Sequence, residues 1–136
     1  MSEPEAAERL RNVPLMATMD DSALKLCAEL ATEFDVPAGH VLAEHGQPGS
    51  GMFVITEGTV VVQLPTGPVE LGPGEFFGEL ALLADVDRIA RVRASTPVSG
   101  LAIGRKEFSQ LLEREPRVAV AMLPVLAHRL AAAESS

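Results

Sequence analysis

The residues best suited to do chemistry lie between positions 72 and 88. Glycines at positions 72, 74 and 78 interrupt the chain, and the apolar run at 80–83 favours a short helical turn. The start of a helix has free backbone N–H groups, which bind anions such as phosphate. Arg88 lies nine residues after Glu79 and can add a charge-assisted contact to the same anion. A carboxylate at Glu79 accepts a hydrogen bond from a sugar hydroxyl, so one nucleotide phosphate and its ribose would satisfy both side chains.

Glu79 and Arg88 also fit a second interpretation. They can form an ordinary ion pair across a turn, while the glycines only shape a corner of the chain. Their spacing alone leaves both interpretations open.

The length and composition indicate one domain over residues 1–136. The chain is 47% apolar and 22% charged, too apolar for a disordered chain. It has no apolar run of about 18 residues and no signal-peptide pattern at its start, so we expect a cytoplasmic protein without membrane insertion. The lone Cys27 excludes an internal disulfide and a multi-cysteine zinc site, and its neighbours predict that it is buried.

The charges are unevenly distributed. The formal net charge is −8, and residues 26–87 contain ten Asp or Glu but no Lys or Arg. Nucleic-acid backbones are bound by clusters of Lys and Arg. We therefore expect no nucleic-acid partner.

The residue pattern predicts helices, then a β-roll, then helices. Residues 1–33 have helical spacing, residues 34–103 form short β runs between glycine and proline turns, and residues 104–136 return to two helices. We therefore predict a mainly β fold with flanking α-helices, an antiparallel, jelly-roll-like β-roll. Tight turns predict two strand pairs, 52–56 with 59–64 and 88–95 with 98–103.

The segment around Glu79 resembles a known family. Residues 77–83 (Phe-Gly-Glu-Leu-Ala-Leu-Leu), then Arg88, Ala90 and Val92, are similar to the phosphate-binding cassette of cyclic nucleotide-binding domains. The segments 36–39, 44–49 and 52–58 resemble the family's early strands and their glycine turns. The resemblance covers residues 13–130 and places the cassette at 77–92.

The resemblance implies a β-roll that binds cyclic AMP or cyclic GMP and needs no cofactor. Arg88 would bind the exocyclic phosphate oxygens and Glu79 the ribose 2′-hydroxyl. The other expected ligand-binding residues are Gly78, Leu80, Ala81, Ile89, Ala90, Val62 and Arg129. The sequence departs from the family at Ile89, at Arg91 and at the acidic residues Asp85 and Asp87.

Ile89 bears on the choice of nucleotide. Family members that favour cyclic GMP often have Thr directly after the arginine, whereas Ile89 has no polar atom. Burying a guanine amine without a partner costs about 1–3 kcal/mol, so we expect cyclic AMP to be preferred. The expected function is a non-enzymatic sensor, and the alternative is an interaction module that kept the roll but lost nucleotide binding.

The last helix has two apolar stripes, and Pro124 is expected to kink or break it near residues 120–124. In the resembling family this helix often closes over the base, and here Arg129 could stack on a purine. The stripes also fit packing in the core or a homodimer seam, and an effector protein could bind the C-terminal helices.

His40, Glu44 and His45 have side chains that can bind a metal ion. On one strand His40 and Glu44 share a face, but His45 points away, and the roll has no further His. We therefore expect no metal.

Overall fold

A computed structural model describes residues 21–44, 46–47, 51–78 and 90–134. The helices are α2 (Asp21–Leu30), α4 (Arg105–Arg114) and α5 (Arg117–Glu134). The strands are β1 (Thr32–Val36), β2 (Val41–Ala43), β3 (Gly51–Glu57), β4 (Val60–Leu64), β5 (Gly67–Leu71), β6 (Phe76–Phe77), β7 (Arg91–Ala94) and β8 (Val98–Gly104).

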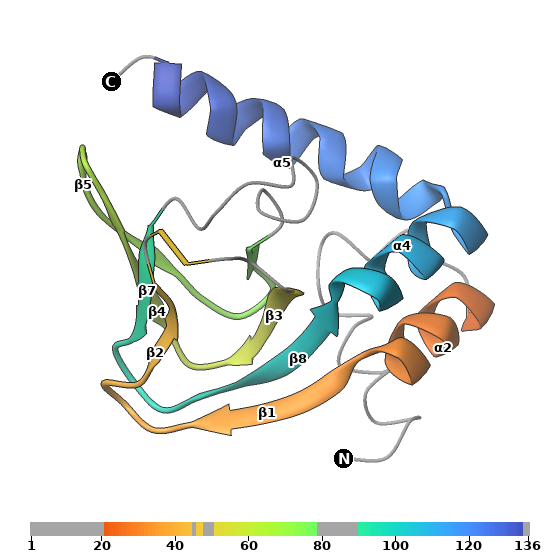
Figure 1. Cartoon of the computed structure of the whole chain (residues 1–136), viewed down its shortest axis with the longest axis horizontal. Helices are drawn as coiled ribbons and strands as arrows, with labels where there is room; N and C mark the ends of the chain where they lie inside the picture. The colour runs from red at the N-terminus through yellow and green to blue at the C-terminus, as the bar shows by residue number, and fades with distance from the viewer. Residues whose placement is uncertain (1–20, 45, 48–50, 79–89, 135–136) are drawn as a thin grey trace.

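The strands form two four-stranded antiparallel sheets (Figure 1). One sheet has the order β1-β8-β3-β6 and the other has the order β2-β7-β4-β5. Strands that are consecutive in the chain often lie in different sheets, as in a jelly roll. The predicted β-roll with flanking helices is therefore confirmed, although its first strand begins at Thr32, two residues before the predicted boundary.

The two predicted strand pairs are wrong. β3 pairs with β8 and β6, whereas β4 pairs with β5 and β7, so the turn at 57–59 carries the chain from one sheet to the other. The turn at 95–97 does the same between β7 and β8. The two turns contact each other, because the Thr59 N–H donates to Thr96 Oγ1 and the Ser95 N–H donates to the Thr59 carbonyl. Gly58 has a φ of 86°, and a Cβ there would meet the Pro97 carbonyl.

The sheet that contains β3 is covered on both faces. Val54 and Ile55 are consecutive and point to opposite faces, yet both are fully buried. Val54 joins a helix-side cluster made with α2, α4 and α5, and Ile55 joins a roll-interior cluster between the two sheets. The helix-side cluster contains Leu24, Cys27, Met52, Val54, Phe76, Leu101, Ile103, Phe108, Leu111, Val118 and Met122, among others.

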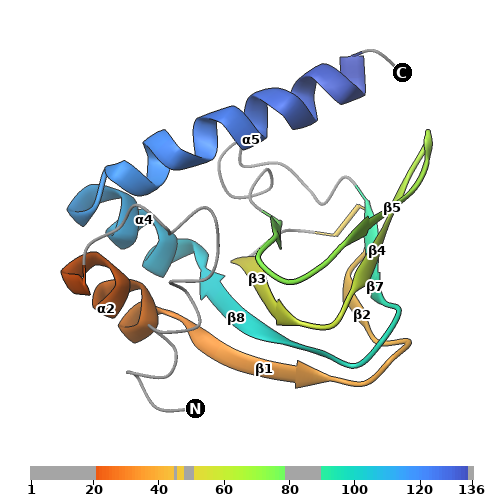
Figure 2. The ribbon, with the colours of Figure 1, turned by 180° about the vertical axis from the view of Figure 1, so that it is seen from behind.

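The C-terminal helices lie near their predicted positions. Pro124 was predicted to kink or break the last helix. α5 is continuous from Arg117 to Glu134, so a break is wrong, and a kink stays a prediction. Pro124 and Val120 are both exposed, which lets water reach the backbone where the proline N–H is missing. Figures 1 and 2 show α5 running from α4 in the direction of the β4–β5 hairpin. The predicted N-terminal helices are confirmed for α2, and their other residues lie outside the described ones.

Candidate functional site

The predicted cassette joins the two sheets of the roll. Its described ends are Gly78, directly after β6, and Ala90, directly before β7. Gly78 has a φ of 93°, a backbone conformation that residues other than glycine rarely adopt. Ala90 is buried. The remaining predicted site residues, namely Glu79, Leu80, Ala81, Arg88 and Ile89, lie outside the described residues, as do Asp85 and Asp87.

A tight turn fixes the strand that enters the cassette. The Glu75 N–H donates to the Gly72 carbonyl at 3.1 Å, and the Glu75 side chain accepts from the Gly72 N–H at 3.0 Å. The backbones of Gly74 and Glu75 each hydrogen-bond to Ile55 at 2.9 Å. β6 is thereby held against β3, with Phe76 opposite Val54.

Three phenylalanines from different strands meet beside the cassette entrance. The Phe77 ring stacks on Phe53 with 4.9 Å between centroids, and Phe53 meets the edge of Phe34 at 5.5 Å. Phe77 is buried, so the last side chain before Gly78 is anchored in the roll-interior cluster. This group was not predicted from the sequence, because the rings come together only through the pairing of β3 with β6 and the packing of β1.

An apolar row crosses the inner face of the second sheet. Val62 pairs with Val92 on one side and with Val69 on the other, so all three side chains share a face. Val92 is 4% exposed and belongs to the roll-interior cluster, whereas Val69 is 42% exposed. The row therefore leads from the core to an apolar surface that water reaches. Val62 was predicted as a site residue, but Val69 was missed, although its alternation with Leu71 was a usable signal.

Arg91 lies two residues before Arg93 on β7 and has a carboxylate partner. Its Nε is 3.0 Å from Glu44 Oε2, and its Nη2 is also 3.0 Å from that oxygen. The hydrogen bond and charge of Glu44 raise the pKa of Arg91 above its ordinary range. This contact ties β2 to β7 at the end of the cassette and gives the Arg91 side chain a structural role.

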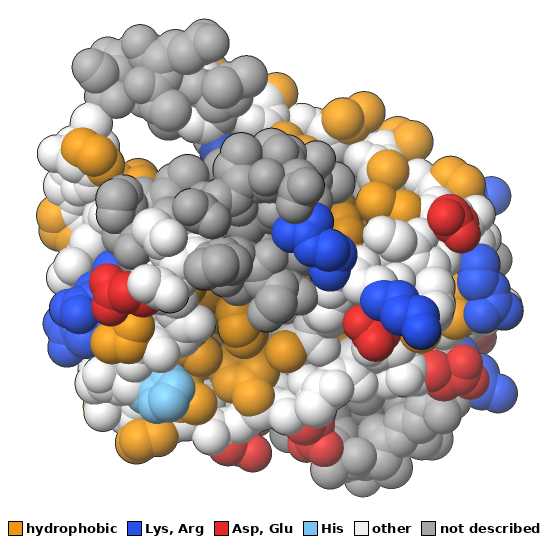
Figure 3. Space-filling view, viewed as in Figure 1, with side chains coloured by type: hydrophobic (Ala, Val, Ile, Leu, Met, Phe, Trp, Pro, Cys, Tyr) orange, Lys and Arg blue, Asp and Glu red, His pale blue; other side chains and the backbone are white. Residues whose placement is uncertain are grey.

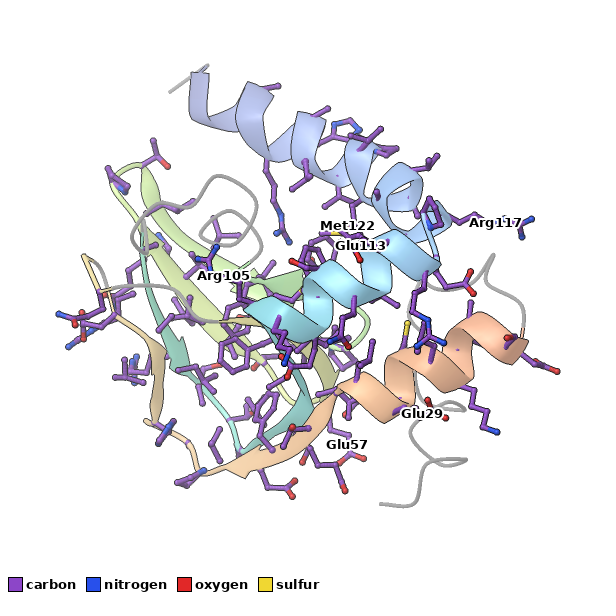
Figure 4. The ribbon with its side chains drawn as sticks, turned by 45° about the vertical axis from the view of Figure 1, so that its right-hand side comes forward. Glu29, Glu57, Arg105, Glu113, Arg117 and Met122 are labelled. Atoms are coloured by element: carbon purple, nitrogen blue, oxygen red, sulfur yellow. The ribbon has the colours of Figure 1, made fainter. Side chains whose placement is uncertain are left out.

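Arg129 connects α5 to the strand that enters the cassette. Its Nη2 donates to the Phe76 carbonyl at 2.5 Å, and its guanidinium carbon lies 4.6 Å from the Phe76 ring centroid. Figure 4 shows Met122 on the same helix, pointing toward α4 and the core. The predicted stacking of Arg129 on a base stays a prediction, and the structure adds Phe76 as the partner that such stacking would replace.

No metal cluster and no membrane span is found within the described parts of the chain. There, no three His, Cys, Asp or Glu side chains group in a way that could hold a metal ion. None of the described helices has the length and apolarity needed to cross a bilayer. His45, which the sequence analysis considered, lies outside the described residues.

The two antiparallel sheets and the helices that cover one of them form a β-roll. The family described as the cyclic nucleotide-binding domain matches residues 33–115, and this chain belongs to that family. The match includes the whole predicted cassette.

Known proteins resemble the chain in sequence and in fold. The cyclic nucleotide-gated potassium channel mll3241 of Mesorhizobium japonicum is 39% identical over 124 residues, which cover 91% of this chain and 35% of the channel. The regulatory subunit of a cAMP-independent protein kinase A from Trypanosoma brucei superposes with a TM-score of 0.83 at 23% identity, over 90% of this chain and 45% of that one. The regulatory domain of Toxoplasma gondii protein kinase A, crystallised with cAMP, superposes with a TM-score of 0.80 at 22% identity, over 92% of this chain and 50% of that one.

This chain spans only part of its curated relatives. It covers 35% of the Mesorhizobium channel and 22% of an uncharacterized NTE family protein of Mycobacterium bovis. The family membership therefore describes one domain, which makes up only part of the length of those relatives.

Proposed function

We propose that this domain binds cyclic AMP in preference to cyclic GMP and passes the binding event to its C-terminal helices, without catalysis of its own. The observation that carries the proposal is the family match across the cassette, whose second described end, Ala90, lies two residues before Val92 in the apolar row of Val62, Val69 and Val92. A cyclic nucleotide has one anionic end and one flat, largely apolar end. The cassette offers donors to the first, and the row offers an apolar surface to the second.

The proposed roles in the cassette follow from the chemistry of its residues. Arg88 binds the phosphate, and Glu79 accepts the hydrogen bond of the ribose 2′-hydroxyl. The backbone N–H groups of Gly78, Leu80 and Ala81 supply further donors. Gly78 supports this role, because its positive φ turns the chain at the point where the donors begin.

The preference for cyclic AMP rests on Ile89. With no polar atom there, a guanine amine would lose a hydrogen bond, at a cost of about 1–3 kcal/mol. That cost corresponds to an affinity for cyclic AMP that is about five- to a hundredfold higher than the affinity for cyclic GMP. The apolar character of Val62 and Val69 supports the same view, since these side chains also have no group that could pair with the amine.

The contact between Arg129 and Phe76 supports transmission to the helices. Phe76 lies two residues before Gly78, so a shift of the cassette acts directly on the carbonyl and ring that hold α5. Arg129 is thus proposed as a positioning residue that couples the cassette to α5.

The competing function is an interaction module without nucleotide binding. The fold alone does not decide the matter, because the same fold occurs in the regulatory subunit of a cAMP-independent kinase. The observation that favours this alternative is the pair Asp85 and Asp87, whose negative charge precedes Arg88.

Calorimetric titration with both cyclic nucleotides tests the proposal. We expect saturable binding of each, tighter for cyclic AMP, and a smaller difference in the Ile89→Thr variant, because the hydroxyl gives the guanine amine a partner. Folded protein that binds neither nucleotide would establish the alternative function. Equal affinities in the wild type, or a difference that Ile89→Thr leaves unchanged, would overturn the assignment of specificity to Ile89.

A further inference from the structure

The turn that leads from β5 to β6 is closed by two hydrogen bonds between the same two residues. The Glu75 N–H donates to the Gly72 carbonyl at 3.1 Å, and Glu75 Oε1 accepts from the Gly72 N–H at 3.0 Å. Pro73 is the second residue of this turn, and Gly74 is the third with a φ of 89°, which is the pattern of a type II turn. The backbone bond is common to turns of this type, whereas the side-chain bond depends on which residue occupies position 75.

Exposure alone does not distinguish Glu75 from other acidic residues. The chain has 19 Asp and Glu residues, and Figure 3 shows acidic side chains spread over the visible face of the molecule. The Glu75 carboxylate differs because it binds a backbone N–H of its own turn. Without this carboxylate, the half-buried Gly72 would lose the acceptor for its N–H.

The closed turn is bound to β3 through the backbone of one residue. The Gly74 N–H donates to the Ile55 carbonyl, and the Ile55 N–H donates to the Glu75 carbonyl, both at 2.9 Å. Ile55 is fully buried in the roll-interior cluster. While the turn is closed, the backbone of Glu75 is therefore held in place relative to the core.

The same turn lies directly before the start of the cassette. Glu75 is three residues before Gly78, and only the two residues of β6 lie between them. A strand of two residues can make few ladder bonds with β3. The bonds of the turn therefore add substantially to what holds this strand, and with it Gly78, in position.

We propose that Glu75 is a positioning residue for nucleotide binding, whose carboxylate keeps the turn closed and so sets the backbone from which the cassette begins. This role rests on the proposed function, because it concerns the affinity for the nucleotide. A domain whose turn is open for part of the time can bind only for the rest, and its apparent dissociation constant rises accordingly. The net contribution of one such hydrogen bond corresponds to about three- to tenfold in an equilibrium constant.

The charge of Glu75 acts in the opposite direction from its hydrogen bond. A carboxylate close to an anion-binding segment disfavours the phosphate, so removing the charge alone should strengthen binding or leave it unchanged. Removing the hydrogen bond should weaken binding. Glu75→Gln keeps an acceptor oxygen and loses the charge, whereas Glu75→Ala loses both, so the two variants separate the two effects.

Calorimetric titration with cyclic AMP compares these variants with the wild type. We expect the dissociation constant of Glu75→Ala to be about three- to tenfold higher, and that of Glu75→Gln to be unchanged within about twofold or lower. The matched control Glu70→Ala removes an exposed carboxylate from β5, where residue 70 lies opposite Val61, and should stay within about twofold of the wild type. Circular dichroism and thermal melting report whether each variant is folded.

Hydrogen exchange without nucleotide separates a failure of this proposal from a failure of the proposed function. The amide protons of Ile55 and Gly74 should exchange faster in Glu75→Ala than in the wild type, and Glu75→Gln should restore the slow exchange. Wild-type affinity or wild-type exchange in Glu75→Ala would overturn the positioning role, as would an equal loss of affinity in Glu75→Ala and Glu75→Gln. A wild type that does not bind cyclic AMP would overturn the proposed function and this role with it, whatever the exchange rates.

Discussion

The two apolar clusters of this domain differ in how completely the chain shields their side chains from water. In the helix-side cluster, α2, α4 and α5 cover the sheet, and Leu24, Cys27 and Leu111 have no exposure at all. In the roll-interior cluster, burial decreases along the row from Val92 to Val69. The first cluster is therefore a core that serves stability, and the second leaves an apolar surface that a ligand can cover.

This comparison predicts that the clusters respond differently to substitution. Changes in the helix-side cluster should lower the free energy of unfolding and leave ligand affinity unchanged while the protein is folded. Changes at the exposed end of the row should lower ligand affinity and leave the free energy of unfolding nearly unchanged. The contacts of Arg129 with Phe76 lie on the helix side of the cassette entrance, and the next residue, Phe77, belongs to the roll-interior cluster.

The largest effect is expected from Leu111→Ala. Leu111 is fully buried in the helix-side cluster, and a cavity there should lower the free energy of unfolding by about 2–5 kcal/mol. Urea unfolding followed by far-UV circular dichroism measures this, because the chain has no Trp or Tyr for fluorescence. The Val69→Ala control should change it by less than about 1 kcal/mol, since that side chain is partly exposed. Equal losses in the two variants would contradict the comparison.

A smaller effect is expected from Cys27 at alkaline pH. Burial, with a contribution from Glu115, raises the pKa of the Cys27 thiol from its ordinary value of 9.0 to about 11. The unfolded chain releases this proton first, so the stability is fully present below pH 9 and decreases as the pH rises toward about 11. The loss should be roughly 2 kcal/mol, and Cys27→Ala should remove most of this slope. If both proteins lost stability equally over this pH range, water would reach the thiol in the folded state.

A still smaller effect is expected from Val69→Asp. The substitution puts a negative charge on the apolar row, the surface proposed to cover the apolar end of the nucleotide, and should weaken cyclic AMP binding roughly tenfold. Val41→Asp is the matched control, since Val41 lies in the same sheet and pairs with the outward-facing Arg93. Both variants should unfold within about 0.5 kcal/mol of the wild type. An equal loss of affinity in both would show that net charge, not the row, affects the ligand.

The sequence was sufficient for the order of the elements that the structure describes, but not for strand pairing. Alternation and glycine turns predicted a β-roll, and the helical spacing predicted two helices within 104–136, where α4 (Arg105–Arg114) and α5 (Arg117–Glu134) are observed. The turn at Gly58 suits a hairpin and a corner between sheets equally well. The choice depends on long-range contacts, such as Thr59 with Thr96, which no local pattern contains.

The same limit applies to the site. Glu79 and Arg88 could be singled out because their charges and spacing are local features of the sequence. The stacking of Phe77 on Phe53 and the contact of Arg129 with Phe76 join residues that are 24 and 53 positions apart. Such contacts depend on how distant parts of the chain pack together, so the structure is needed to find them.

Calorimetric titration of cyclic AMP into Arg88→Ala, with Arg93→Ala as the control, tests the central claim most directly. Arg93 is an exposed arginine on β7, so its loss removes the same charge without touching the cassette. Removing the partner of a desolvated phosphate costs about 2–5 kcal/mol, so the dissociation constant of Arg88→Ala should rise at least about thirtyfold. The control should stay within about threefold of the wild type. Wild-type affinity in a folded Arg88→Ala variant would contradict the claim that this cassette binds the nucleotide phosphate.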